Sequence, residues 1–173
     1  MMNFRLASLE DLPQLKAVYR KIIDNMNQND IPIWDEIYPC EFLKTDIENG
    51  ILYILEDDSV IISAFALCET NSGETFVTWE SADSKAMYLD RFGVNVDYAG
   101  RGIGSFMLKK AISLAGEKNA EYLRLFVVDI NEPAIKLYIK NGFKRAGGIY
   151  DEVIDNELVL HEIGFEIKTV CKY

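Results

Sequence analysis

The N-terminal part of the chain carries two hydrophobic patterns in succession. Residues 3–7 alternate polar and apolar side chains, which is typical of an edge strand. Ser8 is a residue type that caps helices, and the apolar residues after it recur at helical spacing: Leu12, Leu15, Val18, Tyr19 and Ile22. The segment 24–31 is polar and rich in turn-forming residues. We therefore predict an edge strand followed by one amphipathic helix that ends where this segment begins.

A loop, a second helix and two strands are predicted next. Residues 31–39 hold two prolines and two large aromatic side chains, which favours a loop. Residues 40–49 suit a helix that Gly50 would end. Residues 52–56 and 60–69 are mostly apolar, and an Asp-Asp-Ser turn joins them, as in a β-hairpin.

The rest of the chain alternates apolar strands with amphipathic helices. Further strands are predicted over 86–96, 122–128, 144–150 and 158–168. Helices are predicted over 106–115 and from Asn131 to Gly142. Residues 151–156 are expected to connect the last two strands, and residues 76–80 suit either a short strand or part of a lid.

The order of the predicted elements is β, α, α, β, β, β, α, β, α, β, β. No repeats, linkers or low-complexity segments interrupt it, and it predicts a mixed α/β fold. A length of 173 residues lies in the range of one domain, so we expect a single domain over 1–173.

The charge balance narrows the classes of partner. The chain has 28 acidic and 18 basic residues, and its formal net charge is -10. A negative surface argues against nucleic acid and anionic membranes as partners, and it is compatible with a cationic substrate. An acidic surface also serves solubility alone, so the charge by itself does not identify the substrate.

Cysteine and histidine usage points to a cytoplasmic protein without a metal. The three cysteines, Cys40, Cys68 and Cys171, are far apart in sequence, and they read as reduced thiols. A single histidine, His161, makes a conventional zinc site improbable. The N-terminus shows no signal-peptide pattern, and no apolar run approaches the roughly 20 residues that span a bilayer.

The segment with the clearest chemistry is the glycine-rich turn from Tyr98 to Ser105. It connects a predicted strand to a predicted helix, so its backbone N–H groups can bind an anion at the helix N-terminus. A dinucleotide fingerprint would need a third glycine at Met107, and a Walker loop would need Lys at Ser105. Both nucleotide motifs therefore fail, while a tight turn without a ligand stays open as the structural alternative.

Two flanking segments give the turn a family context. Phe92-Gly93-Val94 precedes it, and the segment from Asn131 to Phe143 follows it. With these segments the chain resembles the GNAT superfamily of N-acetyltransferases, whose motifs are Q/R-x-x-G-x-G/A after a bulged fourth strand and N-x-x-A-x-x-L/F-Y-x-x-x-G-F. The resemblance covers residues 88–143 in motifs and nearly the whole chain in element order. It implies a mostly antiparallel, twisted sheet of about six or seven strands with about four helices, splayed between the fourth and fifth strands.

The same resemblance implies acetyl-CoA as cofactor and assigns residues to it. The backbone of Phe92, Gly93 and Val94 would pair with the pantetheine arm. The pyrophosphate is expected on the amides of Gly100, Arg101, Gly102, Ile103, Gly104 and Ser105. Asn131 would hydrogen-bond the arm, and Ala134 would pack against it. Ala99 departs from the family pattern, which has Gln or Arg at this position, and Arg101 is the candidate to replace that contact.

Catalytic roles are implied for three residues. Tyr138 would be the general acid for the leaving thiolate, with a core tyrosine as the structural alternative. The amide N–H of Val94 would polarise the acetyl carbonyl. Asp90 is the candidate base, because alternation puts it on one strand face with Tyr88 and Phe92, and Glu80 is the reserve.

The acceptor is expected to be a small primary amine. Trp34, Tyr38 and Trp79 are the predicted aromatic walls of its pocket, and Tyr88 joins them as a predicted contact; core filling is the alternative for the aromatic residues. A protein N-terminal or lysine acetyltransferase and a non-catalytic acyl-CoA binding module remain open as alternatives. Dimers are common in the family, so a homodimer is a further expectation.

Overall fold

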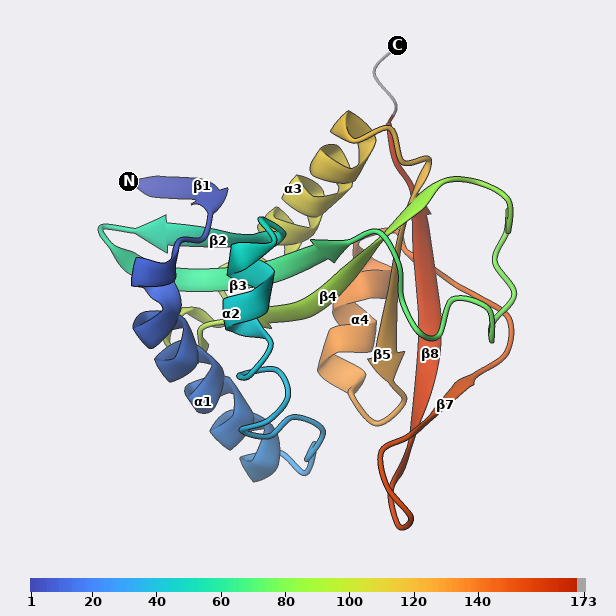
Figure 1. Cartoon of the computed structure of the whole chain (residues 1–173), viewed down its shortest axis with the longest axis horizontal. Helices are drawn as coiled ribbons and strands as arrows, with labels where there is room; N and C mark the ends of the chain where they lie inside the picture. The colour runs from blue at the N-terminus through green and yellow to red at the C-terminus, as the bar shows by residue number, and fades with distance from the viewer. Residues whose placement is uncertain (171–173) are drawn as a thin grey trace. The chain divides into compact units, whose positions relative to one another are not determined.

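The computed structural model describes residues 1–170 and alternates strands and helices as the sequence predicts (Figure 1). The strands are β1 Met2–Leu6, β2 Leu52–Asp57, β3 Val60–Cys68, β4 Ala86–Val94, β5 Tyr122–Val128, β6 Lys144–Arg145, β7 Tyr150–Val153 and β8 Val159–Lys168. The α-helices are α1 Leu12–Gln28, α2 Leu43–Glu48, α3 Ile103–Glu117 and α4 Glu132–Lys140. Two short 3-10 turns, η1 Leu9–Asp11 and η2 Val96–Tyr98, complete the described elements.

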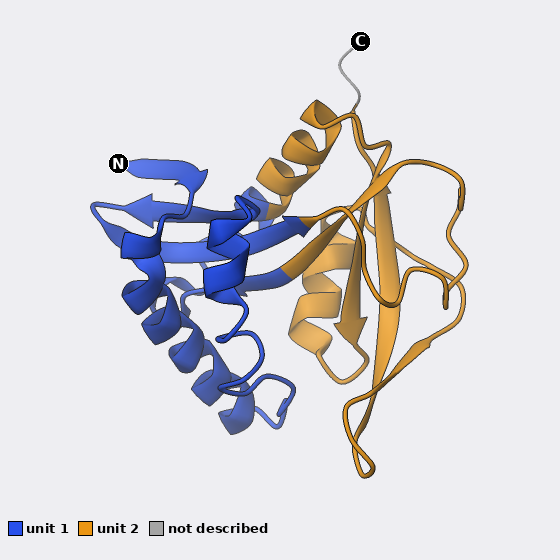
Figure 2. Ribbon diagram, viewed as in Figure 1, with its two compact units in different colours: residues 1–67, 91–107 blue, residues 68–90, 108–173 orange. Residues whose placement is uncertain are grey.

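The described chain forms two compact units (Figure 2). Unit 1 contains Met1–Leu67 and Arg91–Met107, and unit 2 contains Cys68–Asp90 together with the described residues after Met107. Strand β4 and helix α3 each begin in one unit and end in the other. The mixed α/β class is confirmed, while a single domain over the whole chain stays a prediction.

Unit 1 is a sheet with two helices on it. Its strands follow the order β1-β2-β3-β4, and β1, β2 and β3 pair antiparallel. Helices α1 and α2 lie side by side (Figure 1). The predicted apolar stripe of α1 is confirmed, because the helix buries Leu15, Val18, Tyr19, Ile22 and Ile23. Strand β3 is buried over most of its length, so it is a central strand.

Unit 2 continues the sheet from the first half of β4. The order there is β4-β5-β8-β6, and β7 also pairs with β8. Strands β4 and β5 are parallel, and their register joins Ala86–Tyr88 to Tyr122–Arg124 only. The remaining pairs of this unit are antiparallel. A parallel pair whose register ends early agrees with the predicted opening between the fourth and fifth strands.

The structure corrects several predicted boundaries. Helix α1 runs to Gln28, because the polar residues after Ile23 lie on its exposed face and need no break. Residue Asp30, with φ +58°, then turns the chain. Helix α2 starts only at Leu43, since the residues from Cys40 still belong to turns, in which Phe42 donates to the carbonyl of Pro39. Strand β4 ends at Val94 rather than at residue 96.

The described chain has eight strands, one more than the six or seven predicted, and the additional strand lies in the C-terminal part. Residues Tyr150–Val153 form β7 on β8, although the sequence suggested a connection there, and only Lys144–Arg145 remain of the strand expected before it. Residues Tyr150–Val153 form a strand because they pair with β8, and a local sequence pattern does not reveal such a distant partner. In the segment 76–80 the described backbone forms no strand, and Thr78 makes a single bridge to Gly147.

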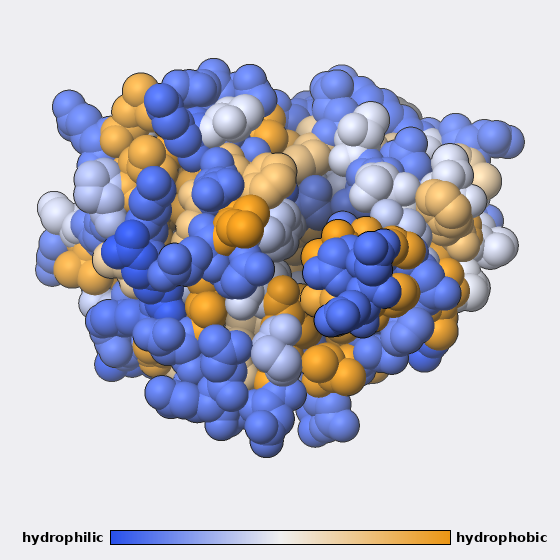
Figure 3. Space-filling model, turned by 60° about the horizontal axis from the view of Figure 1, so that its bottom comes forward, coloured by the Kyte–Doolittle hydropathy of each residue, from blue (hydrophilic) through white to orange (hydrophobic). Residues whose placement is uncertain are grey.

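The surface is mostly hydrophilic on the face drawn in Figure 3, with hydrophobic residues in separate patches. Among the described residues, no helix is long and apolar enough to cross a membrane. The described residues also include no group of three or more side chains that could hold a metal ion. Within the described part of the chain, neither Cys40 nor Cys68 is in a disulfide, and Cys171 lies outside that part.

An ion pair at the start of the fold generates a stability prediction. Arg5 contacts both carboxylate oxygens of Asp11 at 2.8 and 2.9 Å, and Ser8 donates its backbone N–H to the same carboxylate at 2.7 Å. Arg5, and then Ser8, hold the pKa of Asp11 down to about 2, and burial opposes them.

We expect Asp11→Asn to lower the free energy of unfolding by about 1 kcal/mol near pH 7, allowing for solvent screening. Because folding lowers this pKa, the contribution is present above the ordinary value of 3.8 and is lost as the pH falls toward about 2. Urea unfolding at several pH values measures the difference. A difference that stays constant down to about pH 2 would contradict an ionic origin.

Candidate active site

The glycine turn leads into α3 within unit 1. Asn95 caps η2 by accepting from the N–H of Asp97 at 3.1 Å, and the chain then passes through Gly100 and Gly102. These glycines have φ of +74° and +75°, a backbone conformation that favours glycine. A Cβ atom at either position would meet nothing within 4 Å. Glycine is therefore required here by backbone conformation, and open space remains beside the turn.

The backbone donors of the turn are available. No hydrogen bond among the described residues uses the N–H groups of Gly100, Arg101, Gly102, Ile103 or Gly104. Such a row of amides at a helix N-terminus suits a phosphate group. The guanidinium of Arg101 lies 4.9 Å from the centre of the Tyr98 ring, and Ala99 has no polar side chain. The residues present thus fit a pyrophosphate held mainly by backbone amides.

Strand β4 breaks its regular geometry just before this turn. Arg91 has φ +52°, which is uncommon for a residue other than glycine. Side chains alternate strictly only along an extended strand, so alternation alone does not place Phe92, beyond Arg91, on the face of Tyr88 and Asp90. The shared face of these three residues stays a prediction.

Gly93 allows α1 to pack directly on β4. A Cβ atom at this position would lie 2.7 Å from Cδ1 of Ile22 and 3.4 Å from the Tyr19 ring. The carbonyl of Gly93 accepts from Oγ of Ser63 at 2.7 Å. Gly93 and Val94 are both in unit 1, and their backbone is thereby anchored from the neighbouring strand and from the helix.

The predicted aromatic residues Trp34 and Tyr38 are half-buried in unit 1. Their rings lie 6.4 Å apart, and Tyr38 also contacts Phe42 at 5.3 Å. The guanidinium of Arg91 sits 5.9 Å from the Tyr38 ring. The carboxylate of Asp35 accepts from backbone N–H groups of its own loop, so it shapes the loop.

Tyr138 and Asp90 both belong to unit 2. Tyr138 lies on α4, is 7% exposed, and packs against the rings of Phe143 and Phe165. Burial raises the pKa of Tyr138 above its ordinary value, and the charge of Asp90 raises the same pKa further. Asp90 accepts from Nδ2 of Asn71 at 3.2 Å. Tyr138 therefore stays protonated over the whole neutral range.

Glu162 is a candidate residue that the sequence did not indicate. It lies on β8 within reach of Glu152 on β7, and burial raises its pKa, with further contributions from Glu152 and Asp90. The pairing of β7 with β8 brings Glu152 and Glu162 together. The sequence predicted a connection in place of β7, so it did not indicate this pair. A carboxyl group with a raised pKa can hold and release a proton near neutral pH.

An aromatic cluster occupies the same unit. Trp79 lies 5.6 Å from Phe126 and 6.3 Å from Tyr88, and Tyr150 lies 5.8 Å from Phe126. Tyr88 and Trp79 are buried at 3% and 7% exposure, so both also fill the core of the unit. Burial raises the pKa of Tyr88, while Arg124 opposes this shift. The reserve base, Glu80, is exposed.

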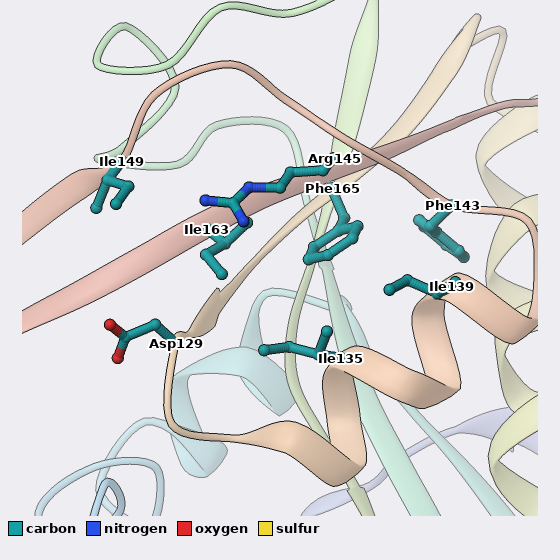
Figure 4. Close-up of a pocket in the computed structure, with 8 residues that line it drawn as sticks. All are labelled: Asp129, Ile135, Ile139, Phe143, Arg145, Ile149, Ile163 and Phe165. Atoms are coloured by element: carbon teal, nitrogen blue, oxygen red, sulfur yellow. The ribbon is translucent and has the colours of Figure 1, made fainter.

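Asn131 has a local role in α4. Its side-chain oxygen accepts from the N–H of Ala134 at 3.4 Å, which caps the helix that carries Tyr138. The spacing from Asn131 to Tyr138 therefore sets where the tyrosine lies on the helix. Neither residue lines the cavity of about 600 Å³ shown in Figure 4. That cavity has six apolar side chains with Asp129 and Arg145, and it contains none of the predicted site residues.

A family profile and several known proteins are similar to this chain in sequence. The profile of the Acetyltransferase (GNAT) family matches residues 17–143. A relative from Bacillus subtilis (strain 168), named "Putative phosphinothricin acetyltransferase YwnH", is 27% identical over 148 residues, or 84% of this chain and 86% of the relative. A thialysine N-epsilon-acetyltransferase from Bos taurus is 34% identical over 71 residues, or 41% of this chain and 42% of that protein.

Solved structures agree on the fold. An acetyltransferase of the GNAT family from Streptococcus agalactiae 2603 has a TM-score of 0.79 at 15% identity, covering 98% of this chain and 96% of that one. The structure of yncA from Salmonella typhimurium, solved with its cofactor acetyl-CoA, has a TM-score of 0.65 at 15% identity, covering 96% and 93%.

The fold and the amide-lined turn define an acyltransferase. The family profile covers more than half of the chain, and the chain belongs to the acetyltransferase (GNAT) family. The protein is accordingly an N-acetyltransferase, and acetyl-CoA is the acetyl donor of this family. The resemblance inferred from the two sequence motifs is confirmed.

The open glycine turn generates a binding prediction. We expect Gly102→Ala to weaken acetyl-CoA binding by about fivefold, because a left-handed alanine costs about 1 kcal/mol and disturbs the amide row. Isothermal calorimetry measures the affinity, and urea unfolding measures the accompanying loss of stability.

Gly50→Ala is the matched control. Gly50 also has a positive φ, +66°, with nothing within 4 Å of a Cβ atom, and it lies in the same unit. We expect a similar loss of stability with unchanged acetyl-CoA affinity. Equal affinity in the two variants would exclude the turn as the pyrophosphate site.

Proposed function

We propose that the protein transfers an acetyl group from acetyl-CoA to a primary amine of a small, cationic molecule, by direct attack within a ternary complex. The observation that carries this proposal is the buried phenol of Tyr138, packed against the rings of Phe143 and Phe165 in the same unit as the carboxylate of Asp90. These two groups are far apart in sequence, and they are an acid and a base of the kinds that the reaction needs.

Tyr138 is the proposed general acid. Because burial and Asp90 raise its pKa, the phenol carries its proton at neutral pH and can donate it to the departing sulfur. The bound acetyl-CoA would supply a thioester, whose acetyl group an amine can attack. Proton donation by the phenol stabilises the sulfur as its bond to the acetyl group breaks.

The carboxylates of unit 2 are proposed to act on the acceptor. An ammonium ion must lose a proton before the nitrogen can attack, and Asp90 would accept it directly or through a water molecule. The raised pKa of Glu162 reflects its burial and the negative charge of Glu152 and Asp90, and a negative potential of this kind favours a cationic acceptor over an anionic one. Asn71 holds the Asp90 carboxylate through its hydrogen bond.

Backbone groups of unit 1 are proposed to hold the donor. The amides of the turn from Gly100 to Ser105 would bind the pyrophosphate, and Phe92, Gly93 and Val94 would pair with the pantetheine arm. The N–H of Val94 would donate to the acetyl oxygen as negative charge develops there. Asn131 and Ala134 would line the arm from the start of α4.

The acceptor would lie among aromatic side chains. The predicted aromatic contacts of the acceptor are Trp34, Tyr38, Trp79 and Tyr88. The names of two relatives refer to phosphinothricin and thialysine, which supports a small molecule as acceptor. A cytoplasmic location and a homodimer remain predictions.

The role of Tyr138 has a direct kinetic test. We expect Tyr138→Phe to lower kcat by at least about tenfold while the affinity for acetyl-CoA stays nearly unchanged, because only the proton donor is removed. Steady-state kinetics and calorimetry measure the two quantities. Tyr122→Phe is the control, since Tyr122 is equally buried in the same unit and has no proposed role. Unchanged turnover in Tyr138→Phe would remove this general acid.

The acceptor class is tested with a panel. We expect acetyl-CoA-dependent acetylation of at least one small amine among putrescine, spermidine, lysine, thialysine and phosphinothricin, with kcat/KM at least about tenfold above that for short peptides. Release of free thiol and mass spectrometry of the products measure the reaction. Activity confined to peptide N-termini or peptide lysines would favour a protein acetyltransferase. Acetyl-CoA binding without any turnover would favour a non-catalytic module.

A further inference from the structure

A buried ion pair lies at the irregular point of β4. Arg91 and Asp46 are 9% and 6% exposed at their side chains. The guanidinium donates to both carboxylate oxygens, with Nε to Oδ2 at 2.5 Å and Nη2 to Oδ1 at 2.9 Å. Asp46 belongs to α2, so this bidentate pair ties the helix to the strand within unit 1.

The backbone of Arg91 is strained and held in place. A non-glycine residue at φ +52° persists only where its surroundings fix the conformation. Two contacts do so here: the Asp46 pair holds the side chain, and the Tyr19 hydroxyl donates to the Arg91 carbonyl. The next residues along the chain are Phe92, Gly93 and Val94, whose backbone is proposed to bind the donor.

The same groups contact the aromatic loop, which comprises residues 31–42. The guanidinium of Arg91 lies 5.9 Å from the Tyr38 ring and 5.6 Å from the Phe42 ring. The ring of Tyr19 lies 5.8 Å from Trp34. The side chain of Arg91 therefore contacts the loop, while its backbone belongs to the donor strand.

We propose that the Asp46–Arg91 pair is a positioning element that couples the aromatic loop to the donor-binding backbone of β4. The proposal rests on the proposed function, in which Phe92–Val94 bind acetyl-CoA. If the pair loosens, Arg91 can relax toward an extended conformation, and that changes the direction of the residues after it. A ligand that fixes this backbone then also favours one arrangement of the loop, and the coupling acts equally in both directions.

The test uses fluorine labels in the aromatic loop. The chain has two tryptophans, and protein labelled with 5-fluorotryptophan gives one fluorine NMR signal each for Trp34 and Trp79, assigned with Trp79→Phe. We expect saturating acetyl-CoA to shift the Trp34 signal in the unmodified protein. In Asp46→Asn this shift should fall to less than about half, and the acetyl-CoA Kd should rise by about fivefold.

Two further variants separate positioning from stability. Tyr19→Phe removes only the hydroxyl that donates to the Arg91 carbonyl, so it tests the coupling even if Asp46→Asn fails to fold. We expect acetyl-CoA to shift the Trp34 signal less in this variant than in the unmodified protein. Asp11→Asn breaks the ion pair with Arg5, elsewhere in the same unit, and should leave both the shift and the Kd within about twofold of the unmodified protein.

The outcomes separate this inference from the proposed function. If calorimetry detects no acetyl-CoA binding to the unmodified protein, both are overturned. If acetyl-CoA binds but the Trp34 signal does not move, only the coupling is overturned. The coupling also fails if Tyr19→Phe and every folded Asp46 variant respond like the unmodified protein, or if Asp11→Asn loses the response to the same extent as they do.

Discussion

The interruption of β4 at Arg91 is the constraint on which the rest of unit 1 depends. A left-handed arginine inside a strand costs free energy, and the surrounding structure must supply compensation. Burial raises the pKa of Asp46, and only its partner Arg91 counteracts this shift. Removing Arg91 would leave the carboxylate of Asp46 buried without this counter-charge, which is strongly destabilising. Gly93 adds a second constraint, since a Cβ atom there would lie 2.7 Å from Cδ1 of Ile22 and the Ile22 side chain would have to move.

Two buried residues of opposite charge are register partners in unit 2. Arg124 and Glu166 face each other across β5 and β8, and each is 3% exposed. Arg124 donates to the carbonyl of Ser81 at 2.7 Å, and Glu166 accepts from the N–H of Glu80 at 3.1 Å. The guanidinium also lies 4.5 Å from the Trp79 ring. Together these contacts hold the segment 79–81, which lies between β3 and β4 and forms no helix or strand, against the sheet.

The two halves of the proposed chemistry depend on different kinds of group. The donor would be held by backbone amides, which depend on local conformation and tolerate changes of side chain. Ala99, at the position where the family motif has Gln or Arg, therefore leaves the amide row unchanged. The acceptor would be held by side chains such as Asp90 and Glu162, which come from separate strands. Their chemistry therefore depends on strand pairing and burial, and variation there can change the acceptor while the donor site is kept.

The sequence by itself determined the element order, the α/β class, the glycine turn and the family, because these follow from local periodicity and short motifs. It also placed Tyr138 on a capped helix, since Asn131 and Gly142 mark that helix locally. Only the tertiary structure revealed the β7 strand, Glu162 and the break at Arg91. Strand pairing, the burial of a carboxyl group and a left-handed arginine depend on partners distant in the chain, and no local pattern encodes such partners.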